Sequence, residues 1–541
     1  MTTTQQQKKG NKFLHTVEWL GNMLPHPVTL FMIFIVLLLI TSALGEYFGL
    51  AVADPRPEGV KGRAADGMIY VVSLLNAEGL SRILTNLVKN FTNFAPLGTV
   101  LVALLGVGIA EKAGLLSAIM RLLVTKSPRK LTTFTIVFAG ILSNTASELG
   151  YVVLIPLAAI IFHSLGRHPL AGLAAAFAGV SGGYSANLLL GTIDPLLAGI
   201  TQQAAQIIDP TYTVGPEANW FFMAASTFMI AFIGYFITEK IVEPQLGPYN
   251  SHLSQEELDL QHSNEVSPLE RKGLRYAGLV FLILCALLAW TVVPENGILR
   301  DPKTGLVTGS PFLKSIVAFI FILFAIPGTV YGIVTKSIRS EKDVVNAMAE
   351  AMSTLGLYLV IIFFASQFVA FFNWTNIGQY IAVKGANFLN EVGLHGGILF
   401  MGFILICAFI NLMIGSASAQ WAVTAPIFVP MLMLTGYSPE IIQAAYRIGD
   451  SVTNIITPMM SYFGLIMATV LKYKKDAGVG TLVSMMLPYS VAFLVAWAAM
   501  FFIWVFVLGL PVGPNSPMFY PRNKCKIKNK AHSPVSFIFL C

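Results

Sequence analysis

Long apolar segments separated by short polar ones run through most of the chain. An α-helix needs about 20 apolar residues to cross the hydrocarbon core of a bilayer. Nine segments have this length: 27–49, 92–111, 170–200, 219–238, 276–293, 313–334, 348–372, 440–470 and 482–510. The pattern therefore predicts an all-α integral membrane protein with about nine transmembrane helices.

Two more apolar regions, near 131–165 and 393–432, are interrupted by small and polar residues. The first contains SNTASELG and the second contains GSASAQW, so hydroxyls and amides occur where lipid-facing helices would be apolar. Non-helical backbone at membrane depth is tolerated only where it is buried in protein or lines a water-filled cavity. We therefore expect both regions to be re-entrant helical hairpins that enter the membrane and return.

The composition agrees with a membrane protein. Of the 541 residues, 55% are hydrophobic and 11% are charged, whereas soluble domains carry about 25% charged residues. The basic residues behind the net charge of +7 lie mainly in short loops. Such loops are usually cytoplasmic in membrane proteins. We therefore expect the lipid bilayer, and not nucleic acid, as a partner. If both hairpins are re-entrant, the basic clusters fall on one face, with the N-terminus inside and the C-terminus outside.

The polarity profile divides the chain into five parts. A basic cytoplasmic tail (1–26) precedes the first membrane half (27–238). A cytoplasmic hydrophilic loop (239–273) then leads to the second half (274–514), and an atypical basic tail (515–541) ends the chain.

The two halves repeat two kinds of polar segment in the same order. SNTAS (143–147) is followed by GYSANLLLGTIDP (183–195), and GSAS (415–418) is followed by GDSVTNIITP (449–458). In the predicted topology the two copies enter the membrane from opposite sides. Such an inverted repeat is the architecture of many secondary transporters, whose binding site lies where the broken segments meet.

Polar side chains at the two hairpin tips are candidate ligands for a substrate or a cation. The candidates are Asn144, Ser147, Asn411, Ser416 and Ser418. Their oxygens suit a cation such as Na⁺, for which we expect a site near Asn144, Asn411 and Asp450. The alternative for each of them is helix packing, since small and hydroxyl residues also hold membrane helices together.

Charged residues within apolar segments are stronger candidates, because each costs about 2.5–3.5 kcal/mol at the bilayer centre. Arg447 and Asp450 are three residues apart and share one helix face. The Arg447 guanidinium suits a substrate carboxylate, and Asp450 suits a coupling cation or a proton. The alternative is a structural Arg–Asp pair. Asp194 is the intramembrane acid of the first half and the symmetric counterpart of Asp450.

Asn187 and Asn454 belong to the same repeated segments and are candidates for ion coupling, with either Na⁺ or H⁺ as the ion. Trp421 could stack on an aromatic group of a substrate, although a membrane tryptophan more often packs or anchors the helix. The sequence contains no phosphate loop, no HExxH motif and no nucleophile–base set. We therefore expect neither an ATP-driven pump nor an enzyme, and no cofactor.

Several stretches resemble the p-aminobenzoyl-glutamate transporter (AbgT) family, in particular its MtrF-like members. They include GILSNTASELGYVVLIPL, NLMIGSASAQWAVTAPIFVPMLML and AAYRIGDSVTNIITPMMSYFGLI, and the similarity covers nearly the whole chain, from residue 15 to residue 514. The resemblance implies a homodimer in the bacterial inner membrane, with nine spans and two hairpins in each subunit. It also implies a substrate pocket formed by Asp194, Asn411, Ser418, Trp421, Arg447, Asp450 and Pro458.

The resemblance further implies ion-coupled secondary transport of p-aminobenzoyl-glutamate, p-aminobenzoic acid or related antimetabolites such as sulfonamides. We expect efflux that contributes to drug resistance, with a functional link to a tripartite efflux pump. Import of p-aminobenzoyl-glutamate is the first alternative. A passive channel for organic anions is a weaker one, because a buried arginine and aspartate suit a gated binding site better.

Overall fold

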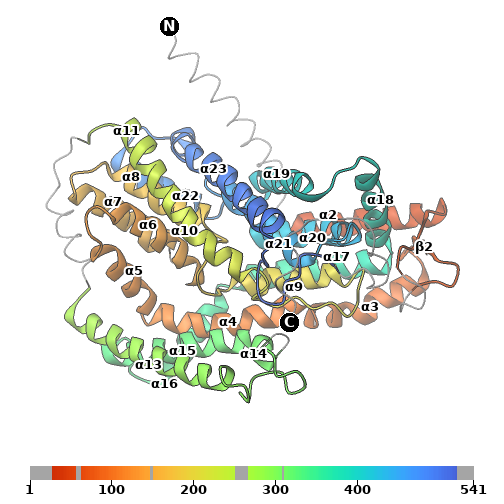
Figure 1. Ribbon diagram of the computed structural model, residues 1–541, viewed down its shortest axis with the longest axis horizontal. Helices are drawn as coiled ribbons and strands as arrows, with labels where there is room; N and C mark the ends of the chain where they lie inside the picture. The colour runs from red at the N-terminus through yellow and green to blue at the C-terminus, as the bar shows by residue number, and fades with distance from the viewer. Residues whose placement is uncertain (1–26, 57–62, 147–149, 250–265, 308–309, 521–541) are drawn as a thin grey trace, which may run out of the picture.

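The computed structural model describes residues 27–56, 63–146, 150–249, 266–307 and 310–520 (Figure 1). This part of the chain is mostly helical with very little strand, which confirms the predicted all-α membrane fold. Its strands are β1 (Ala51–Ala53) and β2 (Met68–Tyr70), which pair antiparallel with Val52 opposite Ile69.

The helices of the first half end before residue 250. They are α2 (Pro27–Tyr47), α3 (Ala77–Thr92), α4 (Ala95–Lys112), α5 (Leu115–Thr125), α6 (Thr132–Ser143), η1 (Asn144–Ala146), η2 (Gly150–Leu154), α7 (Ile155–Ser164), α8 (Pro169–Phe177), η3 (Ala178–Gly182), α9 (Ile193–Ala205), α10 (Trp220–Ile237), η4 (Thr238–Val242) and α11 (Glu243–Leu246).

The helices of the second half begin at Pro268. They are α13 (Pro268–Val292), α14 (Pro311–Lys314), α15 (Ile316–Thr335), α16 (Glu341–Ser353), α17 (Gly356–Trp374), α18 (Ile377–Glu391), α19 (Gly396–Ile414), α20 (Ala417–Leu434), α21 (Pro439–Thr453), α22 (Phe463–Tyr473), α23 (Val479–Phe502) and η5 (Ile503–Val507).

Nine helical stretches in the described residues are long and apolar enough to cross a membrane, and one of them, Ala77–Lys112, combines α3 and α4. They differ in part from the nine predicted segments. The predicted segments 170–200 and 440–470 are each two helices separated by a break, whereas both arms of the second hairpin, α19 and α20, reach spanning length. Length and hydropathy cannot separate a re-entrant arm from a span, because both need an apolar helix.

Residues 77–92, just before the predicted span 92–111, form the amphipathic helix α3. At the predicted loop 239–273, helix continues through η4 and α11 to Leu246, and α13 begins at Pro268. The tail predicted at 1–26 lies outside the described residues.

Two broken helices cross the centre of the fold, one in each half. The first runs through α8 and η3, loses helical structure over residues 183–192 and resumes as α9. The second runs through α21, is non-helical over 454–462 and resumes as α22. Glycine and proline occur at these breaks: Gly183 and Gly191 lie within the first gap, and Pro458 lies within the second, where it supplies no N–H for a helix.

The two hairpins approach the centre from opposite ends of the molecule. In Figure 1, α6 and α7 lie on the left, and α19 and α20 lie to the right of the centre. The second hairpin turns at Gly415, whose φ of 55° is a left-handed conformation that favours glycine. This arrangement agrees with an inverted repeat.

A second, smaller hydrophobic core joins α4, α13, α15 and α16. Its helices approach closely at glycines: a Cβ at Gly106 would lie 2.4 Å from the carbonyl oxygen of Phe321, and one at Gly328 would lie 2.7 Å from the Cα of Ala110. Small residues permit this backbone contact in membrane helices. The hairpins and broken helices belong to the larger core.

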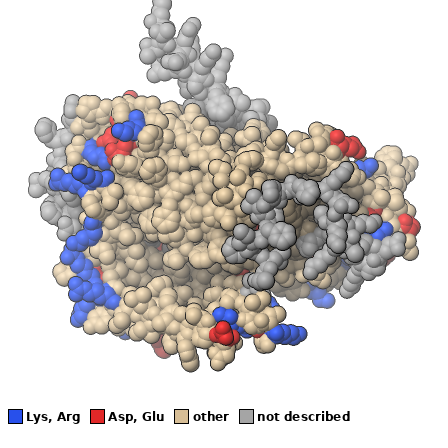
Figure 2. All heavy atoms as spheres, viewed as in Figure 1, with Lys and Arg blue, Asp and Glu red and all other residues tan. Residues whose placement is uncertain are grey.

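Lysine and arginine side chains gather along the end of the molecule where α5, α7 and α11 lie (Figure 2). At this end Arg167 joins the base of the first hairpin to the α10–α11 segment. Its Nη2 lies 2.7 Å from Glu239, and the same guanidinium also pairs with Glu243. The observed edge agrees with the predicted clustering of basic residues on one face.

Candidate functional site

A buried ion pair joins the two halves at the centre of the molecule. Arg447 Nη1 on α21 lies 2.7 Å from Asp194 Oδ1 in the first turn of α9, with side-chain exposures of 1% and 5%. Arg447 Nη2 also donates a hydrogen bond of 2.9 Å to the carbonyl of Ser185, and the Gly191 N–H donates one of 2.7 Å to Asp194 Oδ2. Both charges are therefore compensated across the gap in the first broken helix.

The sequence indicated a shared face for Arg447 and Asp450, but the arginine pairs with Asp194 from the other half. Asp450 is fully buried. Its Oδ1 is 3.4 Å from the Tyr446 hydroxyl, and its Oδ2 has no hydrogen-bond partner among the described residues. An unpartnered buried carboxylate oxygen is unusual, and it is a place where a proton or a cation can bind.

An asparagine at each hairpin tip binds the backbone of the broken helix in its own half. Asn144 Nδ2 donates to the carbonyl of Val180 at 2.9 Å, and Asn411 Nδ2 donates to the carbonyl of Asp450 at 2.6 Å. In both side chains the Oδ1 atom is buried and has no partner in the described part of the chain. The two contacts are of the same kind, an asparagine amide that donates to a backbone carbonyl of the broken helix.

The remaining polar candidates lie around these two contacts. Asn454 accepts a hydrogen bond of 2.7 Å from Asn411, whereas the buried Asn187 has an Nδ2 without a partner among the described residues. Ser416 and Ser418 are half-buried at the start of α20. Ser147 lies in residues 147–149, outside the described part. Pro458, in the gap before α22, is half-buried.

Trp421 is fully buried, and one face of its ring is already covered. It stacks on Tyr446 with 4.2 Å between ring centroids and 20° between planes, and its indole N–H donates to Thr201 Oγ1 at 2.8 Å. Thr201 in turn lies 2.5 Å from Gln443 Oε1. In this conformation Trp421 is a packing residue, so stacking on a substrate would require Tyr446 to move.

Sequence reasoning missed several residues that hold this site. Tyr446, Thr201 and Gln443 position Trp421, and the Ser185 carbonyl accepts from Arg447. Polar side chains in apolar segments were the available signal for Thr201 and Gln443. No sequence signal marks a backbone carbonyl, because its role depends on the unwound conformation around it.

The site combines a buried arginine, two buried acids and two unwound helices at the meeting point of inverted halves. A family model describing the AbgT transporters matches residues 12–520. The chain belongs to the AbgT transporter family. The p-aminobenzoyl-glutamate transport protein of Escherichia coli (strain K12) is 40% identical over 523 residues, which cover 96% of this chain and 99% of that protein.

Two solved structures of AbgT-type proteins are similar to this chain over almost their full length. One is MtrF of Neisseria gonorrhoeae, described with a class of antimetabolite efflux pumps, at 82% identity, with a TM-score of 0.88 and coverage of 93% of this chain and 100% of that one. The other is the YdaH transporter of Alcanivorax borkumensis, at 44% identity and a TM-score of 0.84, covering 91% and 100%. The assignment confirms a membrane transporter, and not an enzyme.

The match to the AbgT family ends at residue 520, so it includes residues 515–520 at the start of the predicted tail. Residues before this point pack on the transporter. Ser516 Oγ donates to the Ala218 carbonyl at 2.6 Å, and Phe519 forms a β-bridge with Tyr437. The rest of the predicted tail, 521–541, lies outside the described residues.

Proposed function

We propose that this AbgT protein is an ion-coupled secondary transporter that exports p-aminobenzoyl-type organic anions and related antimetabolites such as sulfonamides. Support comes from the relatives: one is named a p-aminobenzoyl-glutamate transport protein, and MtrF is placed among antimetabolite efflux pumps. We place it in the bacterial inner membrane, with the basic edge of Figure 2 in the cytoplasm. The homodimer and the link to a tripartite pump remain predictions.

The buried pair between Asp194 and Arg447 is the observation that carries this proposal. Arg447 Nη1 pairs with Asp194, and Nη2 donates a hydrogen bond to the Ser185 carbonyl. Its Nε has no partner among the described residues. A substrate carboxylate or sulfonyl group would bind the guanidinium in competition with Asp194. Because Asp194 and the substrate would compete for Arg447, the charge on Asp194 would affect the affinity for the substrate, and this links the two binding events.

The unpartnered oxygens near this pair support ion coupling. Asp450 Oδ2, Asn144 Oδ1 and Asn411 Oδ1 are buried without a partner in the described residues. Na⁺ would be held by oxygens at the ends of broken helices, as in other inverted-repeat transporters. H⁺ would need only a carboxylate, and Asp194 and Asp450 both supply one.

Transport by purified protein in sealed liposomes tests this function. Labelled p-aminobenzoic acid or its glutamate conjugate is placed outside, and a Na⁺ gradient and a pH gradient are imposed separately. Accumulation beyond equilibrium under one gradient is the expected result, and its direction identifies symport or antiport. If the labelled substrate only reaches equal concentrations on both sides, and neither gradient changes this, the proposal is contradicted and a passive channel is favoured.

Variants connect the transport activity to the site. Arg447→Ala and Asp450→Ala should abolish accumulation when equal amounts of folded protein are reconstituted, because the first removes the anion partner and the second the ion site. Arg129→Gln, which removes an exposed charge between α5 and α6, is the matched control and should transport normally. Normal transport by both site variants would refute these roles.

A further inference from the structure

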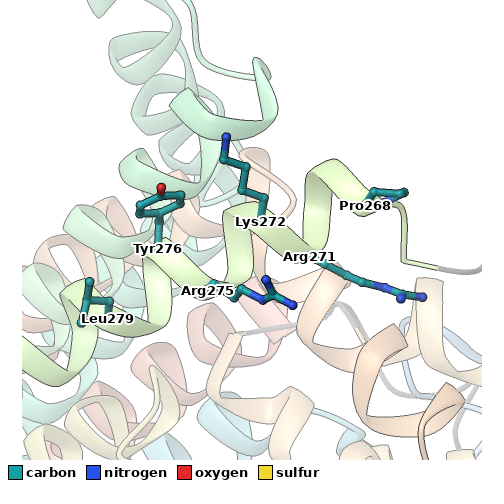
Figure 3. Close-up of a pocket in the computed structure, with 6 residues that line it drawn as sticks. All are labelled: Pro268, Arg271, Lys272, Arg275, Tyr276 and Leu279. Carbon is teal, nitrogen blue, oxygen red and sulfur yellow. The ribbon is translucent and has the colours of Figure 1, made fainter.

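Charged side chains differ between the two ends of the molecule. At the basic edge they are exposed in the single chain: in Figure 3, Arg271, Lys272 and Arg275 project from the start of α13. The opposite end carries two buried acids. Glu217, between α9 and α10, is 6% exposed, and Glu440, in the first turn of α21, is 3% exposed. Such groups need partners, because an isolated ionised carboxylate is very costly in a protein interior.

The α9–α10 connection and the start of α21 meet at this end. Helix α10 begins at Trp220 and leads to the segment that pairs with Arg167 at the basic edge, so the residues before Trp220 lie at the other end. Asn219 Nδ2 donates a hydrogen bond of 2.8 Å to the carbonyl of Glu440. Glu217 is two residues away and is a charge that acts on Glu440. The two acids therefore share one buried neighbourhood.

Neither acid has a cationic partner among the described residues. The titratable groups that act on Glu440 and on its hydrogen-bond partner Tyr212 are Glu217, Tyr520 and Asp209, and each of these is neutral or negative. Glu217 Oε2 has no hydrogen-bond partner within the described ranges, and burial raises the pKa of Glu217. If both acids were ionised, their repulsion would remain uncompensated.

The hydrogen bonds of Glu440 fit a protonated carboxyl group. The Tyr212 hydroxyl lies 3.1 Å from Glu440 Oε1 and 3.0 Å from Oε2. A hydroxyl has one hydrogen to donate and can also accept. If Glu440 carries a proton, it donates to the Tyr212 oxygen, and Tyr212 donates to the other carboxyl oxygen. Hydrogen bonds from Ser438 and from the backbone N–H of Glu440 offset part of the cost of a charge, but not the repulsion by Glu217.

The C-terminal segment 511–520 packs on both elements that carry these acids. A Cβ at Gly513 would lie 2.4 Å from the carbonyl oxygen of Glu217, so the two backbones are in direct contact. The Met518 carbonyl accepts a hydrogen bond of 3.3 Å from the Ser438 N–H at the start of α21. Repulsion between two ionised acids beneath this segment would oppose its packing.

A chain of hydrogen bonds leads from this neighbourhood to the transport site. Asn219 Oδ1 accepts from Gln443 Nε2 at 2.8 Å, and Gln443 Oε1 accepts from the Thr201 hydroxyl at 2.5 Å. Thr201 Oγ1 in turn accepts from the Trp421 indole N–H at 2.8 Å. A rearrangement around the two acids would therefore be transmitted to Trp421.

We propose that Glu440, with Glu217 beside it, is a proton-binding site at the outer end of the protein, separate from Asp194 and Asp450. While Glu440 holds a proton, segment 511–520 stays packed and this end is closed. When both acids are ionised, the segment loosens. The outer position rests on the proposed orientation, whereas the tests below need no substrate, so their failure is distinct from a failure of the proposed transport.

Infrared difference spectroscopy of the detergent-purified full chain, titrated with pH, tests for the proton. An ordinary glutamate is fully ionised at about pH 7. The wild type should still show the carbonyl stretch of a buried protonated carboxyl group at that pH, and Glu440→Gln should remove this component. Glu217→Gln should retain it but lose it about one pH unit earlier, because the neighbouring like charge is gone.

The matched control is Glu391→Gln, which removes an exposed acid at the end of α18 and should leave the spectrum unchanged. A wild type without the component, or a component that Glu440→Gln leaves in place, would overturn the proposal. Arg522 follows this segment and lies outside the described residues. Arg522→Gln should match the wild type; a component that appears only in this variant would mean that a cation neutralises the acid, and the proposal would be wrong.

Hydrogen–deuterium exchange tests the closure, with the backbone amide of Tyr520 as reporter, since it donates to the Gly436 carbonyl at 2.9 Å. After correction for the intrinsic pH dependence of exchange, protection in the wild type should fall as the pH rises, by up to roughly tenfold for each pH unit, because opening releases one proton. Glu440→Gln stays neutral, so its protection should not depend on pH. The same pH dependence in Glu440→Gln, or none in the wild type, would refute the closure.

Discussion

Neutralising one member of the Asp194–Arg447 pair should destabilise the protein about as much as neutralising both. The two side chains are 5% and 1% exposed, with 2.7 Å between Nη1 and Oδ1. Removing one partner of a buried pair typically costs about 3–5 kcal/mol, because the other charge is left unpaired. We expect Asp194→Asn and Arg447→Gln each to lower the free energy of unfolding by about this amount.

The double variant Asp194→Asn/Arg447→Gln should lose about 3–5 kcal/mol, and not the sum of about 6–10, because no buried charge remains. The difference is a coupling energy of about 3 kcal/mol or more. Both introduced amides can still form hydrogen bonds: the new side chain at position 194 can accept from the Gly191 N–H, and the one at position 447 can donate to a carbonyl. The cycle thus removes the charges while it preserves most of the local polar contacts.

Reversible unfolding in mixed detergent micelles with increasing dodecyl sulfate, followed by tryptophan fluorescence, measures the wild type and the three variants. The control is the same double-mutant cycle on the pair Lys112–Glu350, whose side chains are both 57% exposed. Its coupling energy should be about 0–1 kcal/mol. Additivity within about 0.5 kcal/mol at the buried pair would refute the reasoning, because the two charges would then not interact.

Three further predictions concern residues around the site and at the basic edge. Partial burial lowers the pKa of His168, so its neutral form is favoured in the fold; stability should decline as the pH falls from about 6.5 toward that lowered pKa, and His168→Gln should flatten the decline in a pH series of thermal unfolding. Thr201→Val should cost about 1–3 kcal/mol by leaving the Trp421 indole N–H unpaired, whereas Thr201→Ser should restore stability in the same detergent assay. Gly449→Ala should cost about 1–3 kcal/mol, because its Cβ would lie 2.6 Å from atoms of α19, whereas Gly464→Ala, with open space, should be neutral or slightly stabilising.

The sequence by itself was sufficient for the membrane class and for the two polar repeats. Long apolar segments require helices in a bilayer, and polar residues at that depth require protein or cavity around them, so the hairpin tips near Asn144 and Asn411 were predictable. Breaks in the two central helices were also indicated, because Gly183 and Pro458 interrupt apolar segments.

Only the tertiary structure decided which charges meet. Helical spacing relates Arg447 to Asp450, its neighbour on the same helix, but the structure pairs it with Asp194 from the other half. It also buries Trp421 against Tyr446 and leaves Asp450 Oδ2 without a partner in the described residues. The reason is that a sequence pattern identifies neighbours only within one helix. Contacts between the two halves depend on how the unwound segments and glycine-rich faces pack in three dimensions.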